Sequence, residues 1–376
     1  MEKLRPNSDI EILRALAILM VLVQHFPSLY FWSDHAFFIS VNKYISFWSG
    51  VDLFLCISGF VVGCSLIGII DAASGDRSKT RKTILAFFTK RAFRLLPTSI
   101  FWVSLIIILT YTYNVSGAFG DKRWNIYQAA SVLTYNYNIL SHYMLINRLP
   151  ATLGPYWSLN LEEQFYFALP LFMIFIKNLR ITALLLFIAI QFFITRQDTY
   201  LFNFRLDALC WGVILSLLFI RGRLSGFEPS FMRKKWISAA ITTILLVLLM
   251  VTIALLNNSP FMVGSIAIIS MLLVYIASFN KRYIFMPDFI RKIMLYIGSR
   301  SYAIYLIHMP AIYFIQESVI RYYIHIGRAP SGSIELSMLM TACAILLTLF
   351  ISEINYRVIE SPLRKLGRKY AERISE

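Results

Sequence analysis

The sequence predicts an all-α polytopic membrane protein with about ten transmembrane helices and both termini in the cytoplasm. Composition is the first reason: 58% of the 376 residues are hydrophobic and 15% are charged, whereas soluble domains carry about 45–50% apolar and about 25% charged residues. The net charge of +16 would suggest nucleic-acid binding in a soluble protein. In a membrane protein, positive charge gathers in cytoplasmic segments, so we expect no nucleic-acid partner.

Apolar runs are the second reason. Ten of them approach the roughly 20 residues that cross the hydrocarbon, and they cover about 11–31, 47–70, 98–115, 156–176, 181–196, 205–220, 236–256, 261–279, 296–316 and 335–356. A weaker apolar segment at about 125–146 is rich in Tyr and Asn, and we expect it to be interfacial or re-entrant.

The placement of Lys and Arg is the third reason. With the N-terminus inside, the inner segments hold 27 of the 36 Lys and Arg residues, the outer segments hold 8, and Arg14 lies within the first span. This asymmetry supports ten spans with cytoplasmic ends. We expect one integral-membrane domain over 1–376, with a basic cytoplasmic segment at 71–97 and no fused extracytoplasmic domain.

The cysteines predict no covalent or metal chemistry. All four lie in apolar runs without CxxC spacing, namely Cys56, Cys64, Cys210 and Cys343. Neither a disulfide nor a zinc site is therefore expected. The N-terminal apolar run has the full length of a span and no small-x-small cleavage site follows it, so we do not expect a cleaved signal peptide.

Ionisable residues inside the spans are the strongest functional signal, because they are costly in lipid and usually face a bundle interior or a water-filled cavity. At a helical rise of about 1.5 Å per residue, these residues fall about 18–20 Å from the inner face. They are His25, Asp52, Glu162, Glu163 and His308. A histidine beside a carboxylate can be held in one tautomer and made more basic, which suits proton removal from a hydroxyl.

Each of these residues also has a purely structural interpretation. Either histidine could serve as a helix–helix hydrogen-bonding residue, and Asp52 could cap the outer end of its helix, where the dipole favours a carboxylate. Glu162 and Glu163 could pair with Arg205. The shared depth favours the functional interpretation.

Arg14 and His25 are eleven residues apart, which is three helical turns plus about 20°, so they share one face at a separation of about 16 Å. One extended ligand could meet both, because the arginine fork suits phosphate. Arg14 could instead be a snorkelling anchor.

The segment 80–97 is basic and amphipathic, with Arg91 and Arg94 three residues apart. It could bind anionic lipid headgroups or a phosphorylated cytosolic ligand. The tail RKLGRKYAER after Pro362 is interpreted as a solvated positive flank.

Several stretches resemble the membrane-bound acyltransferase 3 family. EILRALAILMVLVQH holds the family's Arg-x10-His pattern, with Glu11 where Asp is usual. FWSGVDLFLCISGFVVG resembles its G-V-D-L-F-F-x-x-S-G-F segment, with Leu55 at the second aromatic. The others are KRAFRLLP, YWSLNLEEQFYFALPL, SYAIYLIHMP, the terminal ESPLRK and, more weakly, RLDALCWGVILS. Their order and spacing over the motif-bearing core at 11–365 make the resemblance specific.

The resemblance implies about ten transmembrane helices and an acyltransferase of groups other than aminoacyl groups. It implies transfer of an acyl group, usually acetyl, from acetyl-CoA or another acyl-CoA to a carbohydrate hydroxyl. Typical acceptors are the O-antigen of lipopolysaccharide, capsule and exopolysaccharide. The expected location is a multi-pass position in the bacterial cytoplasmic (inner) membrane. Acyl-CoA is a co-substrate, and no cofactor is expected to be bound permanently.

Resemblance and depth together suggest a mechanism. Arg14, Arg91 and Arg94 would bind the donor on the cytoplasmic side, and a lipid-linked glycan would approach from outside. His25 would act as general base on the hydroxyl or would carry the acyl group transiently as an acyl-imidazole. The residues expected to orient or polarise His25 are Glu162 or Glu163 and Asp52. Further pocket candidates are Ser58, Trp157 and His308.

Two other classes of protein remain open. A multi-pass proton-coupled transporter of a small solute could use the same acids and histidines as a proton relay. Glycines and prolines do not pair between two halves of the chain, as they would at broken helices of inverted repeats. A non-catalytic scaffold would leave the common depth of the ionisable residues unexplained. The sequence does not reveal the acceptor, the acyl chain or the oligomeric state.

Overall fold

The computed structural model describes residues 7–30, 32, 40–73, 75–196, 198–257, 259–329 and 332–375. In this part of the chain the regular elements are helices, and no strand occurs. The chain divides into two compact units, which we describe separately. Unit 1 holds 1–21, 40–77 and 165–301, and unit 2 holds 22–39, 78–164 and 302–376. The prediction of a single domain is not tested by this division.

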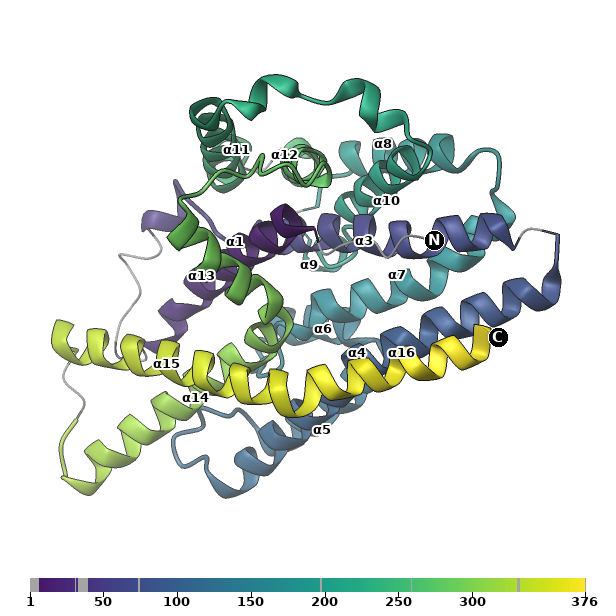
Figure 1. Ribbon diagram of the computed structural model, residues 1–376. Helices are drawn as coiled ribbons and strands as arrows, with labels where there is room; N and C mark the ends of the chain where they lie inside the picture. Colours follow the sequence, from purple (N-terminus) through teal and green to yellow (C-terminus); the bar gives the residue numbers. More distant parts are fainter. Residues whose placement is uncertain are drawn as a thin grey trace. The chain divides into compact units, whose positions relative to one another are not determined.

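Each predicted span corresponds to a helix. The helices are α1 (Ser8–His25), α3 (Gly50–Ala72), α4 (Arg77–Thr112), α7 (Tyr156–Phe175), α8 (Arg180–Phe193), α10 (Asp207–Ile220), α11 (Lys235–Leu255), α12 (Phe261–Ser278), α14 (Ser301–His325) and α15 (Ile334–Asn355). Figure 1 shows them along the chain. The all-α membrane fold is thereby confirmed.

The number of spans is not settled by these helices. Within the described residues, eight helices are long and apolar enough to cross a membrane. Two predicted spans do not meet that standard: α7, which carries Glu162 and Glu163, and α8, which has 14 residues. The count of ten and the cytoplasmic position of both termini therefore stay predictions.

Several boundaries differ from expectation. Helix α1 ends at His25, and a 3₁₀ turn with Pro27, η1 (Phe26–Leu29), follows. The basic segment is not separate, because α4 continues for 36 residues with Pro97 inside it. The predicted span 296–316 is broken at Arg300, between α13 (Asp288–Ser299) and α14. The segment 125–146 forms two short helices, α5 (Lys122–Leu133) and α6 (Tyr137–Ile146).

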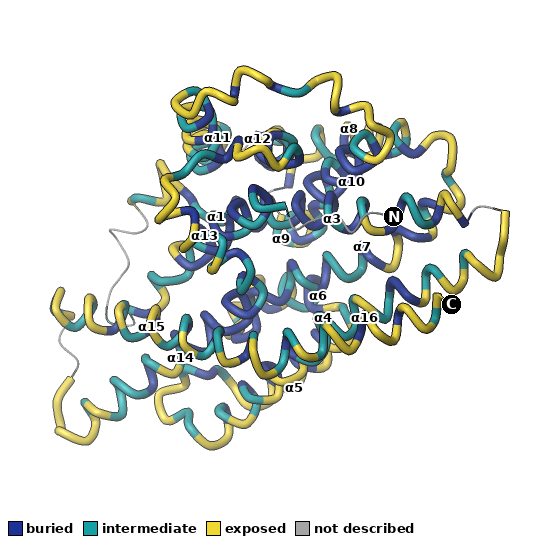
Figure 2. Tube along the Cα trace, viewed as in Figure 1, coloured by how far each residue is buried: buried dark blue, intermediate teal, exposed yellow. Residues whose placement is uncertain are grey.

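The C-terminal tail also differs from the expected solvated flank. Helix α15 continues through a π-helical turn, η4 (Tyr356–Glu360), into α16 (Ser361–Ser375). Residues Glu360, Gly367 and Ala371 are buried and Arg364 is half-buried, so one stripe of α16 is covered. Figure 2 shows exposed positions alternating with covered ones along α16. This spacing is that of one helical face.

Unit 1 is built on close backbone contact between α3 and α10. A Cβ atom added at Gly59 would collide with the carbonyl oxygen of Leu209, and one added at Gly212 would collide with the carbonyl oxygen of Cys56. Gly63 and Ser216 continue the contact one turn further. Such small-xxx-small spacing lets membrane helices approach closely, where dispersion contacts hold them.

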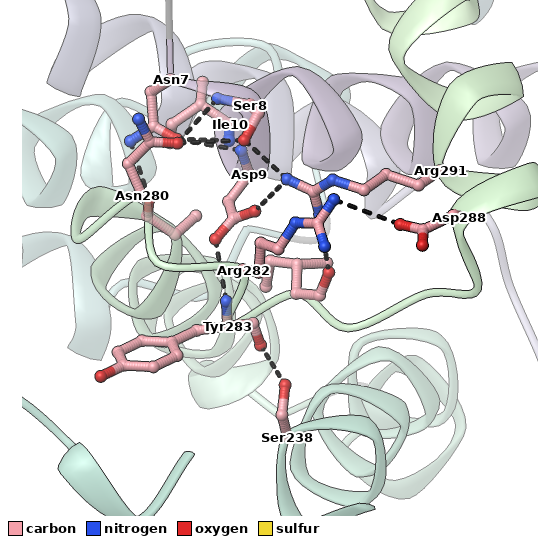
Figure 3. Close-up of polar contacts among 12 residues, drawn as sticks. Asn7, Ser8, Asp9, Ile10, Ser238, Asn280, Arg282, Tyr283, Asp288 and Arg291 are labelled. Atoms are coloured by element: carbon pink, nitrogen blue, oxygen red, sulfur yellow. Dashed lines mark hydrogen bonds and ion pairs between the residues drawn. The ribbon is translucent and has the colours of Figure 1, made fainter. Parts of the chain in front are cut away.

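The beginning of α1 is anchored within unit 1 (Figure 3). Asn7 caps the helix, because its Oδ1 accepts the backbone N–H groups of Asp9 and Ile10 at 3.0 and 3.1 Å. Buried Asp9 accepts hydrogen bonds from the Arg291 guanidinium and the Tyr283 N–H, both at 2.9 Å. These contacts tie α1 to α13 and to the segment that precedes α13.

Unit 2 packs around α4 and α14. Trp102, Val103 and Ile106 of α4 form one apolar cluster with Ala303, Leu306 and Ile307 of α14. Trp157 in the first turn of α7 packs against the same cluster. Further along α14, Met309 and Ile312 join Leu29 and residues of α15 in a second cluster. Helix α14 is thereby held on both sides of His308.

Candidate functional site

Helix α14 presents three polar residues at intervals of three positions: Tyr302, Tyr305 and His308. Residues three apart on a helix lie on neighbouring positions of one face. Tyr305 is buried and shares a hydrogen bond of 2.7 Å with the Ser158 hydroxyl of α7, while its own hydroxyl also donates to the carbonyl of Pro155 at 3.0 Å. This contact fixes α14 against the beginning of α7.

The two histidines are brought together within unit 2. His308 is fully buried, and its Nε2 lies 3.1 Å from Nδ1 of half-buried His25. The ring centroids are 5.0 Å apart with the planes tilted by 35°. His25 is the last residue of α1, where the carbonyl end of the helix dipole favours a cation. The common depth predicted for His25 and His308 agrees with this contact.

The backbone determines which nitrogen carries a proton. His308 Nδ1 lies 2.7 Å from the carbonyl oxygen of Tyr305. A carbonyl only accepts, so Nδ1 of His308 carries hydrogen and, in the neutral ring, Nε2 is the acceptor. His25 must then donate from Nδ1, which leaves the lone pair on its Nε2. The sequence predicted a carboxylate beside His25, whereas the contact found in unit 2 is with a second imidazole.

Glu162 and Glu163 lie at a different height along the helix axes from the two histidines. Glu162 and Glu163 line a small cavity with Tyr156, Tyr302 and Ser99. Because Ser158 meets Tyr305 whereas the later residues of α7 meet Tyr302, the two helices are antiparallel. Glu162 is four residues beyond Ser158, and His308 is three residues beyond Tyr305 in the opposite direction. Glu162 and His308 are therefore about 10 Å apart along the helix axes. The common depth that was expected for the ionisable residues does not include the glutamates.

The donor-binding candidates have different surroundings. Arg14 forms an ion pair of 2.8 Å with Glu11, one turn earlier in α1. Arg91 lies over the ring of Phe87 at 5.7 Å. Arg94 is half-buried, makes no hydrogen bond or ion pair with a described residue, and has a fully covered Nε. Arg94 is also within electrostatic range of Tyr302, which lines the cavity of the two glutamates.

Asp52 and Ser58 belong to α3 in unit 1. Buried Asp52 pairs with Nε of buried Arg205 at 2.8 Å, and the Arg205 guanidinium lies 3.9 Å from the centroid of the Phe202 ring. The suggested pairing of Arg205 with the glutamates is therefore replaced by a pair with Asp52. Ser58 shares a hydrogen bond of 2.5 Å with the hydroxyl of Tyr166. The roles predicted for Asp52 and Ser58 stay predictions.

Sequence reasoning did not single out Tyr302 and Tyr305. The signal was available, since both precede His308 at three-residue spacing in SYAIYLIHMP, which places them on one face. Their partners on α7 could not be read from spacing, because spacing within one helix does not identify the helix opposite.

An integral membrane helical bundle with a paired-histidine site is the class of protein that these features define. The family model described as an acyltransferase domain matches residues 7–354. The chain therefore belongs to the acyltransferase 3 family, as the motifs suggested.

Curated relatives extend this result. The O-acetyltransferase OatA of Staphylococcus aureus (strain NCTC 8325 / PS 47) is 29% identical over 387 residues, which cover 95% of this chain and 57% of the relative. The putative O-acetyltransferase SAS0844 of Staphylococcus aureus (strain MSSA476) is 24% identical over 390 residues, which cover 98% and 59%. The chain thus spans less than two thirds of the length of these relatives. No solved structure matches the chain.

Proposed function

We propose that the protein is an O-acyltransferase of the bacterial cytoplasmic membrane. It moves an acyl group, in the first instance acetyl, from a cytosolic acyl-CoA to a hydroxyl of an envelope or exported glycan such as O-antigen or exopolysaccharide. Family membership and the printed names of the relatives support the reaction class. The hydrogen-bonded pair of His25 and His308 is the observation that carries the chemistry.

In the proposed step, the lone pair on Nε2 of His25 takes the proton of the acceptor hydroxyl as its oxygen attacks the thioester carbon. The carbon–sulfur bond breaks, and the coenzyme leaves as a thiol with the proton returned by His25. His308 accepts from Nδ1 of His25 and stabilises the imidazolium that forms, as does the C-terminal end of α1. If Nε2 instead attacks the thioester itself, the carbon–sulfur bond breaks, the coenzyme leaves as a thiolate and the acyl-imidazole forms on the same nitrogen. The acceptor hydroxyl then takes the acyl group from Nε2, and its proton neutralises the thiolate.

The cytosolic end of the donor is proposed to meet the arginines. Arg14 is on the same uninterrupted helix as His25, eleven residues and about 16 Å away. Arg94 is within electrostatic range of Tyr302, from which α14 continues through Tyr305 to His308. The pantetheine arm of an acyl-CoA would extend along this direction. Glu162 and Glu163 would then line the path of the donor below the histidines.

The proposal is tested with full-length protein reconstituted in vesicles and supplied with acetyl-CoA and an oligosaccharide acceptor. The expected result is release of free coenzyme A thiol that depends on the acceptor, together with an acetylated sugar detected by mass. His25→Ala should abolish both signals while the protein still inserts into the membrane, since a positioned base contributes about 10²–10⁴-fold and an acyl carrier cannot be replaced.

Two outcomes would contradict the proposal. Full activity of the His25→Ala protein would refute the mechanism. Absence of thiol release across a panel of acceptors, with movement of a solute across the vesicle instead, would favour the transporter. In cells, comparison of surface glycans with and without the protein by mass should show a lost acetyl increment.

A further inference from the structure

The C-terminal helix α16 lies against the first half of α4 within unit 2. The rings of Phe93 and Tyr370 are stacked with centroids 5.6 Å apart. A Cβ atom added at Gly367 would collide with the side chain of Phe93. Further along, the Trp102 indole donates to Oδ1 of Asn355 at 3.1 Å. The two helical segments are therefore antiparallel and in direct contact, and Figure 1 shows α16 alongside α4.

This packing turns an arginine of α16 inward. Arg364 is half-buried, and it belongs to the covered stripe that also holds Glu360, Gly367 and Ala371. Its guanidinium is within electrostatic range of Arg94 and Arg368. We call Arg94, Arg364 and Arg368 the arginine cluster.

The arginine cluster carries more positive charge than its surroundings neutralise. Glu360 is the acidic side chain within range of Arg364. Neither Arg364 nor Arg94 makes an ion pair or hydrogen bond with any residue that the structure describes. Gathering like charges in a partly covered place is unfavourable unless an anion joins them. Neighbouring guanidinium groups that make no ion pair are suited to phosphate, which they bind through paired N–H donors.

The arginine cluster also adjoins the candidate donor path. Arg94 and Glu360 are within electrostatic range of Tyr302. The Tyr302 hydroxyl donates to the carbonyl of Leu95 at 2.8 Å, and its ring lines the cavity with Glu162 and Glu163. An anion held by the arginine cluster would therefore lie at the beginning of the path that leads along α14 to His308.

We propose that Arg364, together with Arg94 and Arg368, binds phosphate groups of the acyl donor, so that the C-terminal helix forms part of the donor site. This inference rests on the proposed function and extends it from α4 to α16. The shared chemistry is a phosphate group, which the coenzyme carries in its nucleotide part and an anionic lipid carries in its headgroup. The test separates these two sources.

The experiment titrates full-length protein, purified in a non-ionic detergent without anionic lipid, with coenzyme A and with pantetheine, which has no phosphate. Arg364→Gln should weaken binding of coenzyme A by about 10- to 100-fold, as expected for loss of charge-assisted hydrogen bonds. Pantetheine binding should not change. Lys365→Gln is the matched control, because it removes the same charge from an exposed position of the same helix and should leave coenzyme A binding intact.

A second variant distinguishes loss of coenzyme A binding from misfolding of the protein. Arg364→Lys keeps the charge and loses the planar fork, so its affinity for coenzyme A should fall between those of the wild type and Arg364→Gln. The melting temperature of each variant is measured in parallel. Equal affinity of Arg364→Gln and Lys365→Gln for coenzyme A would overturn the inference.

The lipid source is examined with vesicles of phosphatidylglycerol. If Arg364→Gln reduced capture of this lipid and left coenzyme A binding unchanged, the arginine cluster would be a headgroup site and the inference would be wrong. Absence of coenzyme A binding by the wild-type protein would instead contradict the donor named in the proposed function. Failure of the inference alone is therefore distinguishable from failure of the function.

Discussion

The hydrogen bonds from His25 to His308 and from His308 to the carbonyl of Tyr305 fix the tautomers of both rings. A base oriented by a second imidazole differs from one oriented by a carboxylate, because the neutral partner adds no negative charge beside the developing imidazolium. In the proposed step, the backbone carbonyl orients His308, and the C-terminal end of the α1 dipole favours the imidazolium of His25.

This arrangement predicts the effect of changing His308. His308→Ala should lower kcat by about 10²-fold, at the lower end of what a positioned base contributes, with little change in the KM for acetyl-CoA. His308→Gln should recover part of the loss, since the amide oxygen of Gln can accept the Nδ1–H of His25. Steady-state kinetics with free-thiol detection measures both. Equal kcat for the Ala and Gln variants would show that acceptance of this hydrogen bond is not the role of His308.

At the residue scale, the contact between the two histidines could be anticipated better than the partners of the other candidate residues. His25 and His308 were both identified because a histidine inside an apolar run is conspicuous, and their depths agreed. Glu162 was placed too near them, because depth was counted from the first residue of each apolar run. That count does not show at which level α7 meets α14, which the contact between Ser158 and Tyr305 sets. Arg364 was assigned to solvent, because nothing in its own segment reveals the helix that covers it.

At the scale of the element, α3 and α10 depend on glycines at their contact. Gly59→Ala should lower the melting temperature, because the added methyl group meets the backbone of Leu209 and overpacking costs about 1–3 kcal/mol. Gly68→Ala is the matched control in the same helix, where a Cβ would meet nothing within 4 Å; it should be neutral or slightly stabilising. Thermal unfolding in detergent measures both, and equal melting temperatures would contradict the proposed contact.

Two connecting segments of unit 1 are joined by Glu228, which lies between α10 and α11. It accepts hydrogen bonds from Lys281 at 2.5 Å and from the Tyr283 hydroxyl at 2.6 Å, and it pairs with Arg233 at 3.2 Å. The hydrogen bond from Lys281, followed by that from Tyr283, lowers the pKa of Glu228 from 4.5 to about 2. The carboxylate therefore stabilises the folded state above pH 4.5, and this contribution is lost as the pH falls toward 2.

Glu228→Gln should consequently melt below the wild type at pH 7, and the gap should shrink as the pH falls from about 4.5 to about 2. Thermal melts across that range provide the measurement. Asp288→Asn is a suitable control, because it removes a carboxylate whose ion pair with Arg282 is exposed and such pairs contribute little. A gap that stayed constant down to about pH 2 would exclude Glu228 titration as its source.

At the scale of the whole molecule, the open question is whether α7 and α8 cross the membrane. Composition and charge predicted ten spans, but the two glutamates lower the apolar character of α7, and α8 is short. The fold class could be predicted because it depends on averages over many residues. The number of spans could not be predicted, since it depends on α7 and α8, and α7 carries polar residues of the candidate site.

A cysteine at position 177 distinguishes the two schemes. If α7 and α8 both cross, the short connection between them is cytoplasmic, and Lys177→Cys should react with an impermeant thiol reagent only after the cells are opened. The background is a chain without its four native cysteines. Lys122→Cys is the control, since it is external in either scheme. Labelling of position 177 in intact cells would reduce the count to eight.

The π-helical turn at Tyr356–Glu360 determines which face of α16 is turned toward α4. Such a turn accommodates one residue more than an α-helical turn, and each residue advances the helix by about 100°. The direction in which the side chains of α16 face around the helix axis therefore depends on this one additional residue. A homologue could retain every arginine of α16 and, by losing one residue here, direct them to a different side.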